Sequence, residues 1–102
     1  MVYPLIVNPE AESDLAVASL YYEQQRTGLG REFLDCVDEV FAKLQANPWL
    51  FAETYKSVRQ TLVRRFPFVV CYMIENGRVY VIAVFHGRRD PNSWKSRTST
   101  TP

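Results

Sequence analysis

The most constraining feature of this sequence is an Asn76-Gly77 pair that separates two long apolar runs, residues 68–74 and residues 79–85. Asn-Gly favours the positive backbone φ angles of a two-residue hairpin turn, and both runs are rich in β-branched and aromatic residues. The pattern therefore predicts two antiparallel strands joined by a tight turn. Because both runs are apolar on both faces, we expect helices on one face of the sheet and a curled sheet or a partner on the other.

Two amphipathic helices are predicted upstream of this hairpin. Apolar residues recur at helical spacing over about residues 9–26 and again over about residues 31–46. Pro9 suits the first turn of the first helix, and residues 27–30 contain two glycines that permit a tight reversal. Since the connection is so short, the two helices should form an antiparallel hairpin.

The remaining segments complete a small α+β domain. Residues 3–7 are typical of a short strand, residues 58–65 of a charged edge strand and residues 48–56 of a connecting loop. The predicted order is β-α-α-β-β-β, a helical hairpin packed on a mainly antiparallel four-stranded sheet. A chain of 102 residues is the size of one domain. We expect that domain to span residues 1–94, followed by a flexible tail over residues 95–102.

Composition argues against several classes of function. No apolar run approaches the roughly 18 residues that a membrane span needs, and the N-terminus lacks the basic segment of a secretory signal. Cys36 and Cys71 are isolated and His86 is the single histidine, so neither a disulfide framework nor a metal site is expected. We therefore predict a cytoplasmic protein with no metal, no cofactor and no membrane partner.

Charge is divided unevenly along the chain. Residues 1–57 contain nine acidic and four basic residues, whereas residues 58–102 contain two acidic and eight basic residues, seven of them arginine. Arginine binds phosphate and carboxylate groups through its planar fork. Two interpretations stay open at this point. Either the basic half meets an anionic partner, which would be nucleic acid or an acidic protein, or it pairs with the acidic helices of the same molecule.

One polar cluster, His86-Gly87-Arg88-Arg89-Asp90-Pro91, follows the last predicted strand. His86 could act as a general acid or base near neutral pH. Arg88 and Arg89 could hold phosphate or stabilise the charge that develops during metal-free RNA cleavage, and Arg59, Arg64 and Arg65 on the preceding strand could add positive charge. The alternative is that the cluster closes a turn and that its arginines form a solvated rim.

Short motifs spread along the chain carry a family resemblance through their order and spacing. They are Asp14-Leu15, Tyr21-Tyr22-Glu23, Gly28-Leu29-Gly30, Phe33-Leu34, Asn47-Pro48, Val58-Arg59, Arg65-Phe66-Pro67-Phe68, Tyr72, and His86-Gly87-Arg88-Arg89-Asp90-Pro91 with Trp94. With these motifs, residues 3–94 resemble the ParE/RelE superfamily of bacterial toxins. The resemblance implies the toxin of a type II toxin–antitoxin pair, whose antitoxin is often encoded beside it and wraps the toxin with an extended segment. Because two short helices cannot cover every apolar face of residues 68–74 and 79–85, we expect an antitoxin segment, either a helix in a groove or an added strand, to cover the rest. The predicted assembly is a heterotetramer with the antitoxin, or a homodimer without it.

The resemblance implies two different targets, because superfamily members divide by what they attack. ParE-like members inhibit DNA gyrase and have no recognised nuclease chemistry. The doublet Arg88-Arg89 before Asp90-Pro91 is more similar to this group. For a ParE-like protein, we predict that the target is bound by Arg64, Arg65, Arg88, Arg89 and Trp94.

RelE-like members instead cut messenger RNA on the ribosome, and this is the alternative prediction. Val69 and its neighbours are apolar where such members typically carry a basic residue, and Trp94 stands near the place of a tyrosine. Both departures weaken the nuclease interpretation, whereas His86 supports it. For a nuclease, the predicted catalytic residues are His86, Arg59, Arg65 and Arg88. A third alternative is an inactive interaction module with the toxin fold.

Overall fold

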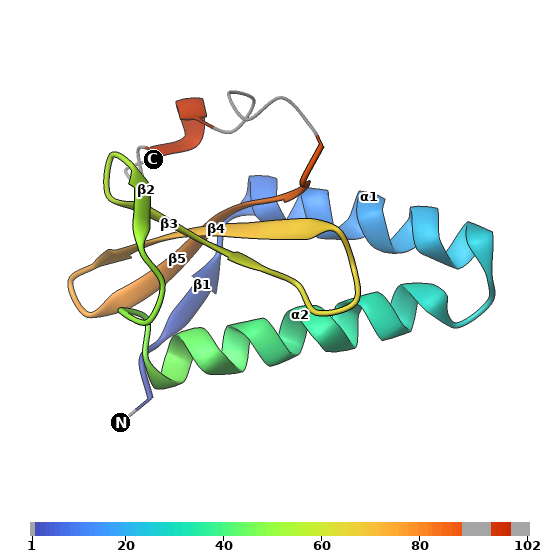
Figure 1. The fold of residues 1–102 in the computed structure, drawn as a ribbon, viewed down its shortest axis with the longest axis horizontal. Helices are drawn as coiled ribbons and strands as arrows, with labels where there is room; N and C mark the ends of the chain where they lie inside the picture. Colours follow the sequence, from blue (N-terminus) through green and yellow to red (C-terminus); the bar gives the residue numbers. More distant parts are fainter. Residues whose placement is uncertain (1, 89–94, 99–102) are drawn as a thin grey trace.

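A mixed five-stranded sheet with two antiparallel helices against one face makes up the computed structural model, which describes residues 2–88 and 95–98 (Figure 1). The strands follow the spatial order β1-β5-β4-β3-β2. The elements are β1 (Leu5–Val7), α1 (Pro9–Gln25), α2 (Leu29–Ala46), β2 (Glu53–Tyr55), β3 (Val58–Leu62), β4 (Phe68–Glu75), β5 (Arg78–His86) and the 3₁₀ helix η1 (Lys95–Thr98). The predicted α+β class and the helical hairpin are confirmed.

The turn between the helices explains why α2 begins two residues earlier than the predicted residue 31. Gly28 precedes α2 with a φ of 91°, a left-handed conformation that favours glycine. The Glu23 carboxylate accepts hydrogen bonds from the backbone N–H groups of Gly28, at 2.9 Å, and Gly30, at 3.1 Å. At Gly30 the two helices approach so closely that a Cβ atom would lie 2.5 Å from the Ser19 carbonyl oxygen. These contacts hold α1 and α2 side by side.

The predicted hairpin is present as β4 and β5. Ile74 pairs with Val79 across the turn, where Asn76 and Gly77 have φ angles of 52° and 74°. These positive values match the turn that an Asn-Gly pair favours. On its other edge β5 carries β1, which pairs in parallel with Val79–Val81.

The predicted strand count of four is wrong, because the expected loop over residues 48–56 contains β2. This short strand pairs with the start of β3, where Glu53 lies opposite Arg59. The chain reverses between them at Lys56 and Ser57, with φ angles of 43° and 68°. Neither residue is glycine, asparagine or aspartate, the residues that favour a positive φ in turns, so the sequence carries little local signal for this reversal.

The main hydrophobic core lies between the helices and the sheet. Phe33 is fully buried at its centre, and its ring lies 5.1 to 5.3 Å from the rings of Tyr22, Phe66 and Phe68. Tyr72 on β4 is also fully buried, and its hydroxyl donates a hydrogen bond of 2.7 Å to the Pro48 carbonyl oxygen. The aromatic residues therefore fix both the hairpin of helices and the loop that follows α2.

A smaller cluster fills the opposite face of the sheet, as the apolar pattern of both hairpin strands predicts. It contains Val58, Cys71, Met73, Ile82 and Ala83. Burial raises the pKa of the Cys71 thiol to about 12.

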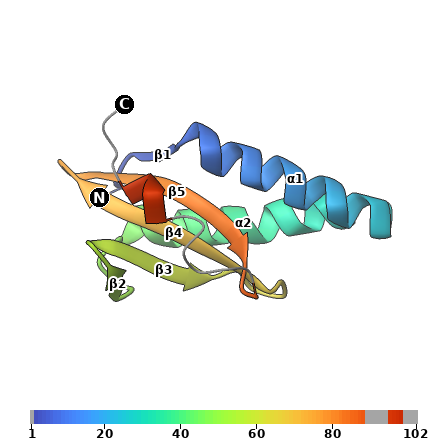
Figure 2. The same ribbon diagram turned by 90° about the horizontal axis from the view of Figure 1, so that it is seen from above.

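Helix η1 lies over the strands on this face, away from α2 (Figure 2). It belongs to residues 95–102, where a flexible tail is expected. Its Lys95 ammonium lies 4.5 Å from the centre of the Tyr55 ring on β2. Residues 99–102 lie outside the described part of the chain. Within that part, neither long helix is apolar enough to cross a membrane.

Candidate functional site

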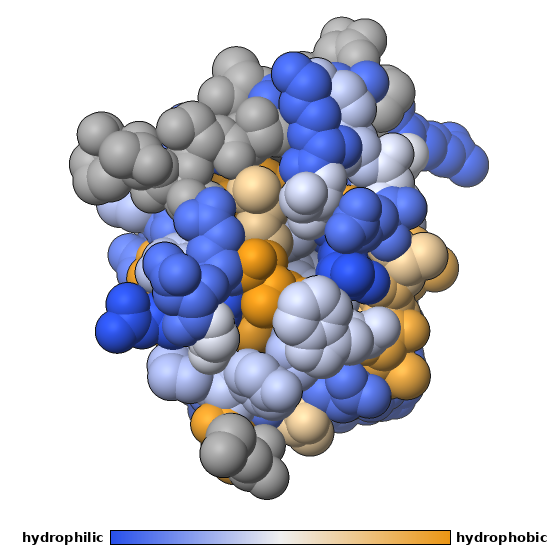
Figure 3. Space-filling view, turned by 90° about the vertical axis from the view of Figure 1, so that its left-hand side faces the viewer, coloured by the Kyte–Doolittle hydropathy of each residue, from blue (hydrophilic) through white to orange (hydrophobic). Residues whose placement is uncertain are grey.

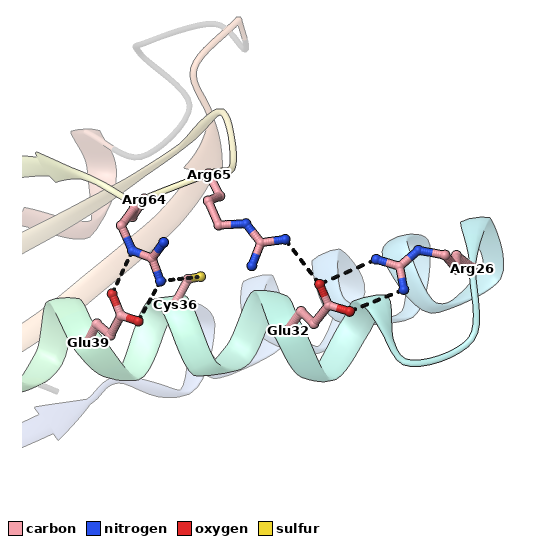
Figure 4. A network of polar contacts seen from close by, with 6 residues as sticks. All are labelled: Arg26, Glu32, Cys36, Glu39, Arg64 and Arg65. Carbon is pink, nitrogen blue, oxygen red and sulfur yellow. Dashed lines mark hydrogen bonds and ion pairs between the residues drawn. The ribbon is translucent and has the colours of Figure 1, made fainter.

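The predicted target-binding residue Arg64 is engaged with α2 of its own molecule (Figure 4). Its guanidinium donates two hydrogen bonds to the Glu39 carboxylate, at 2.7 and 2.9 Å. This pairing lowers the pKa of Glu39 below its ordinary range. The pair is solvent-exposed on both sides, so it positions the guanidinium more than it stabilises the fold.

Arg65 makes the equivalent contact with α2 about two turns earlier, at Glu32 (Figure 4). Its guanidinium lies 3.1 Å from the Glu32 carboxylate, which Arg26 also approaches to 3.1 Å. Hydrogen bonds from Arg26 and then from Arg65 lower the pKa of Glu32. For Arg64 and Arg65, the structure therefore favours the interpretation in which the basic half pairs with the acidic helices. The Arg64 and Arg65 side chains remain about half exposed, at 58% and 50%.

The Arg59 guanidinium contacts the segment between α2 and β3. Its guanidinium donates a hydrogen bond to the Phe51 carbonyl oxygen, lies 5.2 Å from the Trp49 ring and pairs with Glu53 at 3.5 Å. Only 15% of its side chain is exposed. Arg59 thus holds the segment between α2 and β2 against β3.

The four predicted catalytic residues do not converge. In the strand register, Arg59 lies opposite Tyr72 of β4, whereas His86 lies opposite Phe68 of the same strand. Those two positions are four residues apart, about 13 Å along β4. Arg59 and His86 also lie on strands that flank β4 from opposite sides. Arg65 points to Glu32, so only His86 and Arg88 are neighbours.

His86 and Arg88 lie at the mouth of an open groove of about 750 Å³ between α1 and the end of β5. We call this feature the α1–β5 groove. The His86 ring packs edge-on against Phe68 at 5.5 Å, and its Nδ1 atom accepts the Arg88 backbone N–H at 3.1 Å. This hydrogen bond places the proton of the neutral imidazole on Nε2. The groove is lined by Asp14, Val17, Ala18, Tyr21, Tyr22, Pro67, Phe68, Val84, Phe85, His86 and Arg88.

The helix wall of the groove presents apolar residues to solvent. Val17 and Tyr21 line the groove and are 63% and 57% exposed, and Leu20 on the same helix is 59% exposed outside the groove lining, although the other side of the helix packs into the core. Val17, Leu20 and Tyr21 are not among the site residues predicted from the sequence. The signal that could have found them is that they are apolar yet fall outside the core-facing stripe of Ala11, Leu15, Ala18 and Tyr22.

Asp14 also lines the groove, although it was not predicted to belong to a site. Its Oδ2 atom accepts the Val84 backbone N–H at 3.0 Å and also contacts the Arg97 guanidinium at 2.7 Å. These three residues are far apart in sequence, so no local pattern could have joined them. Two predicted target-binding residues, Arg89 and Trp94, lie outside the described residues.

The opposite end of the molecule presents a different surface. Viewed from the side that carries the β4–β5 turn, polar side chains surround small apolar patches (Figure 3). Within the described residues, no group of histidine, cysteine, aspartate or glutamate side chains has the arrangement of a metal site. The α1–β5 groove is therefore the surface on which we base the functional argument.

Solved structures of toxin–antitoxin systems share this fold. The chain is similar to a chromosomal ParDE system from P. aeruginosa, with a TM-score of 0.73 and 17% identity over 83% of this chain and 96% of that one. It is also similar to the RelBE2 toxin–antitoxin complex of Mycobacterium tuberculosis, with a TM-score of 0.59 and 17% identity over 84% of this chain and 99% of that one. At these identities the likeness establishes the fold alone.

Sequence comparison narrows the class to one family. The model of the ParE toxin of type II toxin–antitoxin systems, parDE, matches residues 5–91. Toxin ParE2 of Mycobacterium tuberculosis is 29% identical over 100 residues, which cover 97% of this chain and 95% of that protein. The chain therefore belongs to the ParE toxin family of type II toxin–antitoxin systems.

Proposed function

We propose that this ParE-family toxin is neutralised by a cognate antitoxin that covers the α1–β5 groove. The observation that carries the proposal is that Val17 and Tyr21 of α1 are exposed apolar residues that line a groove with an apolar floor, with exposed Leu20 near them on the same helix. Apolar side chains gathered along a groove are typical of a surface that a protein partner buries. The similar structures from P. aeruginosa and M. tuberculosis are described as a ParDE system and a toxin–antitoxin complex.

Co-expression with the protein encoded beside the toxin gene tests this proposal. We expect that protein to co-purify with the toxin and to restore growth. Val17→Glu should weaken the complex about tenfold or more, because it puts a charge into the apolar interface. Leu62→Glu is the matched control, since Leu62 is 70% exposed but lies on β3, outside the groove. Equal affinity for both variants would place the antitoxin elsewhere.

We further propose that the toxin stops growth by binding DNA gyrase and not by cutting RNA. Membership of the ParE family supports gyrase as the target. The separation of Arg59 from His86 also supports binding over nuclease chemistry, because acid–base catalysis needs its groups within reach of the same reacting atoms.

The order in which cells lose DNA and protein synthesis tests the target. After induction of the toxin, incorporation of labelled thymidine should fall before incorporation of labelled methionine. The reverse order would indicate that messenger RNA is attacked first. Normal growth and normal incorporation of both labels would instead support the inactive interaction module.

The position of His86 and Arg88 supports messenger RNA cleavage as the second candidate function. His86 and Arg88 lie together at an open groove mouth, where a general acid or base and a phosphate-binding group could meet the same substrate. If the toxin cuts RNA, primer extension on translated messages would reveal the cuts, and His86→Ala would reduce them about 100-fold or more.

A further inference from the structure

The turn between α2 and β2 is the feature from which we draw a further inference. It presents two consecutive large apolar side chains to solvent, Trp49 and Leu50, which are 57% and 59% exposed. Their neighbours on either side are turned inward, since Pro48 is fully buried and Phe51 packs against the main core. The fold therefore buries the segment around this pair and leaves the pair outside. Exposed apolar side chains that gather at one place are candidates for contact with a partner.

Hydrogen bonds hold the backbone of this turn on both sides of the exposed pair. The Asn47 side-chain oxygen accepts the Trp49 N–H at 3.2 Å, and the Asn47 carbonyl oxygen accepts the Leu50 N–H, also at 3.2 Å. From the core, the Tyr72 hydroxyl donates to the Pro48 carbonyl oxygen at 2.7 Å. The backbone that carries Trp49 and Leu50 is therefore fixed before any partner arrives, and less conformational entropy is lost on binding.

The Trp49 ring is also supported by a neighbouring side chain. The Arg59 guanidinium lies 5.2 Å from the centre of this ring, donates to the Phe51 carbonyl oxygen and pairs with Glu53 at 3.5 Å. Arg59 thus supports the ring from the side of the sheet, while more than half of Trp49 stays exposed. Tryptophan is one of the residues that contribute most to binding at protein interfaces. We call Trp49 and Leu50 together the anchor.

Charged groups near the anchor indicate which occupant fits it. Lys43, in the last turn of α2, and Lys56, directly after β2, are exposed and form no ion pair with a described residue. Glu53, the acidic residue of this segment, is paired with Arg59. The surface is thus apolar with a small positive charge, whereas nucleic-acid binding depends on many phosphate contacts. The occupant that fits is a protein surface with an apolar pocket and carboxylates at its rim.

We propose that the anchor binds the protein that this toxin attacks, by inserting Trp49 and Leu50 into an apolar pocket of that protein. The proposal rests on the proposed function, because the attacked protein is assigned as DNA gyrase. Carboxylates around the pocket meet Lys43 and Lys56. Neither anchor residue lines the α1–β5 groove, so target binding and antitoxin binding can be altered separately.

Inhibition of supercoiling by purified gyrase measures what the anchor contributes. We expect Leu50→Glu to need at least about tenfold more toxin than the wild type for half-inhibition, because it puts a negative charge against the apolar pocket and its acidic rim. Leu50→Lys should lose less, since its ammonium group can meet that rim. Leu62→Glu is the matched control, because Leu62 is 70% exposed on β3 and lies outside the anchor, and it should inhibit like the wild type.

Photo-crosslinking tests the contact itself. Both cysteines of the chain are buried, so Leu50→Cys adds a single exposed thiol that can carry a benzophenone group. On illumination with gyrase and relaxed plasmid, we expect this labelled variant to crosslink to a gyrase subunit. Leu62→Cys, labelled in the same way, should give no such product. All of these variants should bind the antitoxin with wild-type affinity, which shows that they are folded.

The outcomes separate the anchor from the proposed function. If the wild type inhibits gyrase and Leu50→Glu inhibits equally well, or if Leu50→Cys crosslinks only to DNA or to a second toxin molecule, the anchor is overturned while gyrase remains the target. A loss of both inhibition and antitoxin binding in Leu50→Glu and Leu50→Lys would overturn it too, because the fold and not a contact would have been damaged. If the wild type itself does not inhibit gyrase, the proposed function fails, and the target assigned to the anchor fails with it.

Discussion

Tyr72→Phe tests how the loop after α2 is held to the sheet. The Tyr72 side chain is fully buried, and its hydroxyl is 2.7 Å from the Pro48 carbonyl oxygen, on a residue that is also fully buried. Removing the hydroxyl leaves that oxygen without its donor in a place that excludes water. Buried groups left unsatisfied in this way cost about 1–3 kcal/mol of the free energy of unfolding.

Urea denaturation followed by circular dichroism measures this loss. We expect the transition midpoint to fall while the slope stays constant, because the surface exposed on unfolding does not change. Tyr80→Phe is the matched control on the neighbouring strand β5, where the side chain is only half-buried. A loss below about 0.5 kcal/mol for Tyr72→Phe, equal to the control, would refute the role of this hydrogen bond.

The effect of Tyr72→Phe on the free energy of unfolding should also depend on pH in the alkaline range. Burial raises the pKa of Tyr72 above its ordinary value of 10.0. A group whose pKa is higher in the folded state contributes stability below its unfolded pKa and loses it as the pH rises toward the folded value. The difference in stability between wild type and Tyr72→Phe should therefore shrink above about pH 10. A difference that stays constant between neutral and alkaline pH would contradict this assignment.

Three further predictions concern the helical hairpin. Phe33→Leu should lower the free energy of unfolding by about 1–2 kcal/mol in urea titrations, because it loses three aromatic contacts; a neutral result would show that the ring cluster is not the core's centre. Gly30→Ala should destabilise the protein by about 1–3 kcal/mol in the same assay, since its Cβ would meet the Ser19 carbonyl oxygen at 2.5 Å, whereas a gain would mean that helix propensity outweighs the clash. Arg64 holds the pKa of Glu39 below its ordinary 4.5, so the stability that this pair supplies is present above that pH and is lost as the pH falls through the lowered value. Glu39→Gln should flatten the fall of the melting temperature in acid, and an unchanged acid profile would argue against the pairing.

Local signals account for the parts of the fold that the sequence predicts well. Asn76-Gly77 specifies its turn through backbone conformation alone, and the helical hairpin follows from apolar spacing and a glycine-rich reversal. Strand β2 could not be predicted in this way. The chain reverses after it at Lys56 and Ser57, which have positive φ angles although neither residue is glycine or asparagine. The parallel pairing of β1 with β5 is likewise set by tertiary packing, since three residues carry too little pattern to specify a partner.

The residues of the candidate site also divide into those that a local sequence pattern reveals and those that only the fold brings together. His86 and Arg88 could be selected from the sequence because a polar cluster after a strand is visible locally, and both line the groove. The contact between Asp14 and Arg97 spans 83 positions in the chain, so only the folded structure reveals it. The pairing of Arg64 with the acidic helix was one of two open interpretations, and charge counts alone could not choose between them.

Supercoiling of relaxed plasmid by purified DNA gyrase tests whether this ParE-family toxin acts by binding gyrase. We predict that added toxin inhibits supercoiling, that His86→Ala inhibits to the same degree, and that the antitoxin restores activity. Undiminished supercoiling at a micromolar excess of folded toxin would contradict the account, above all if the same preparation cleaved translated messenger RNA.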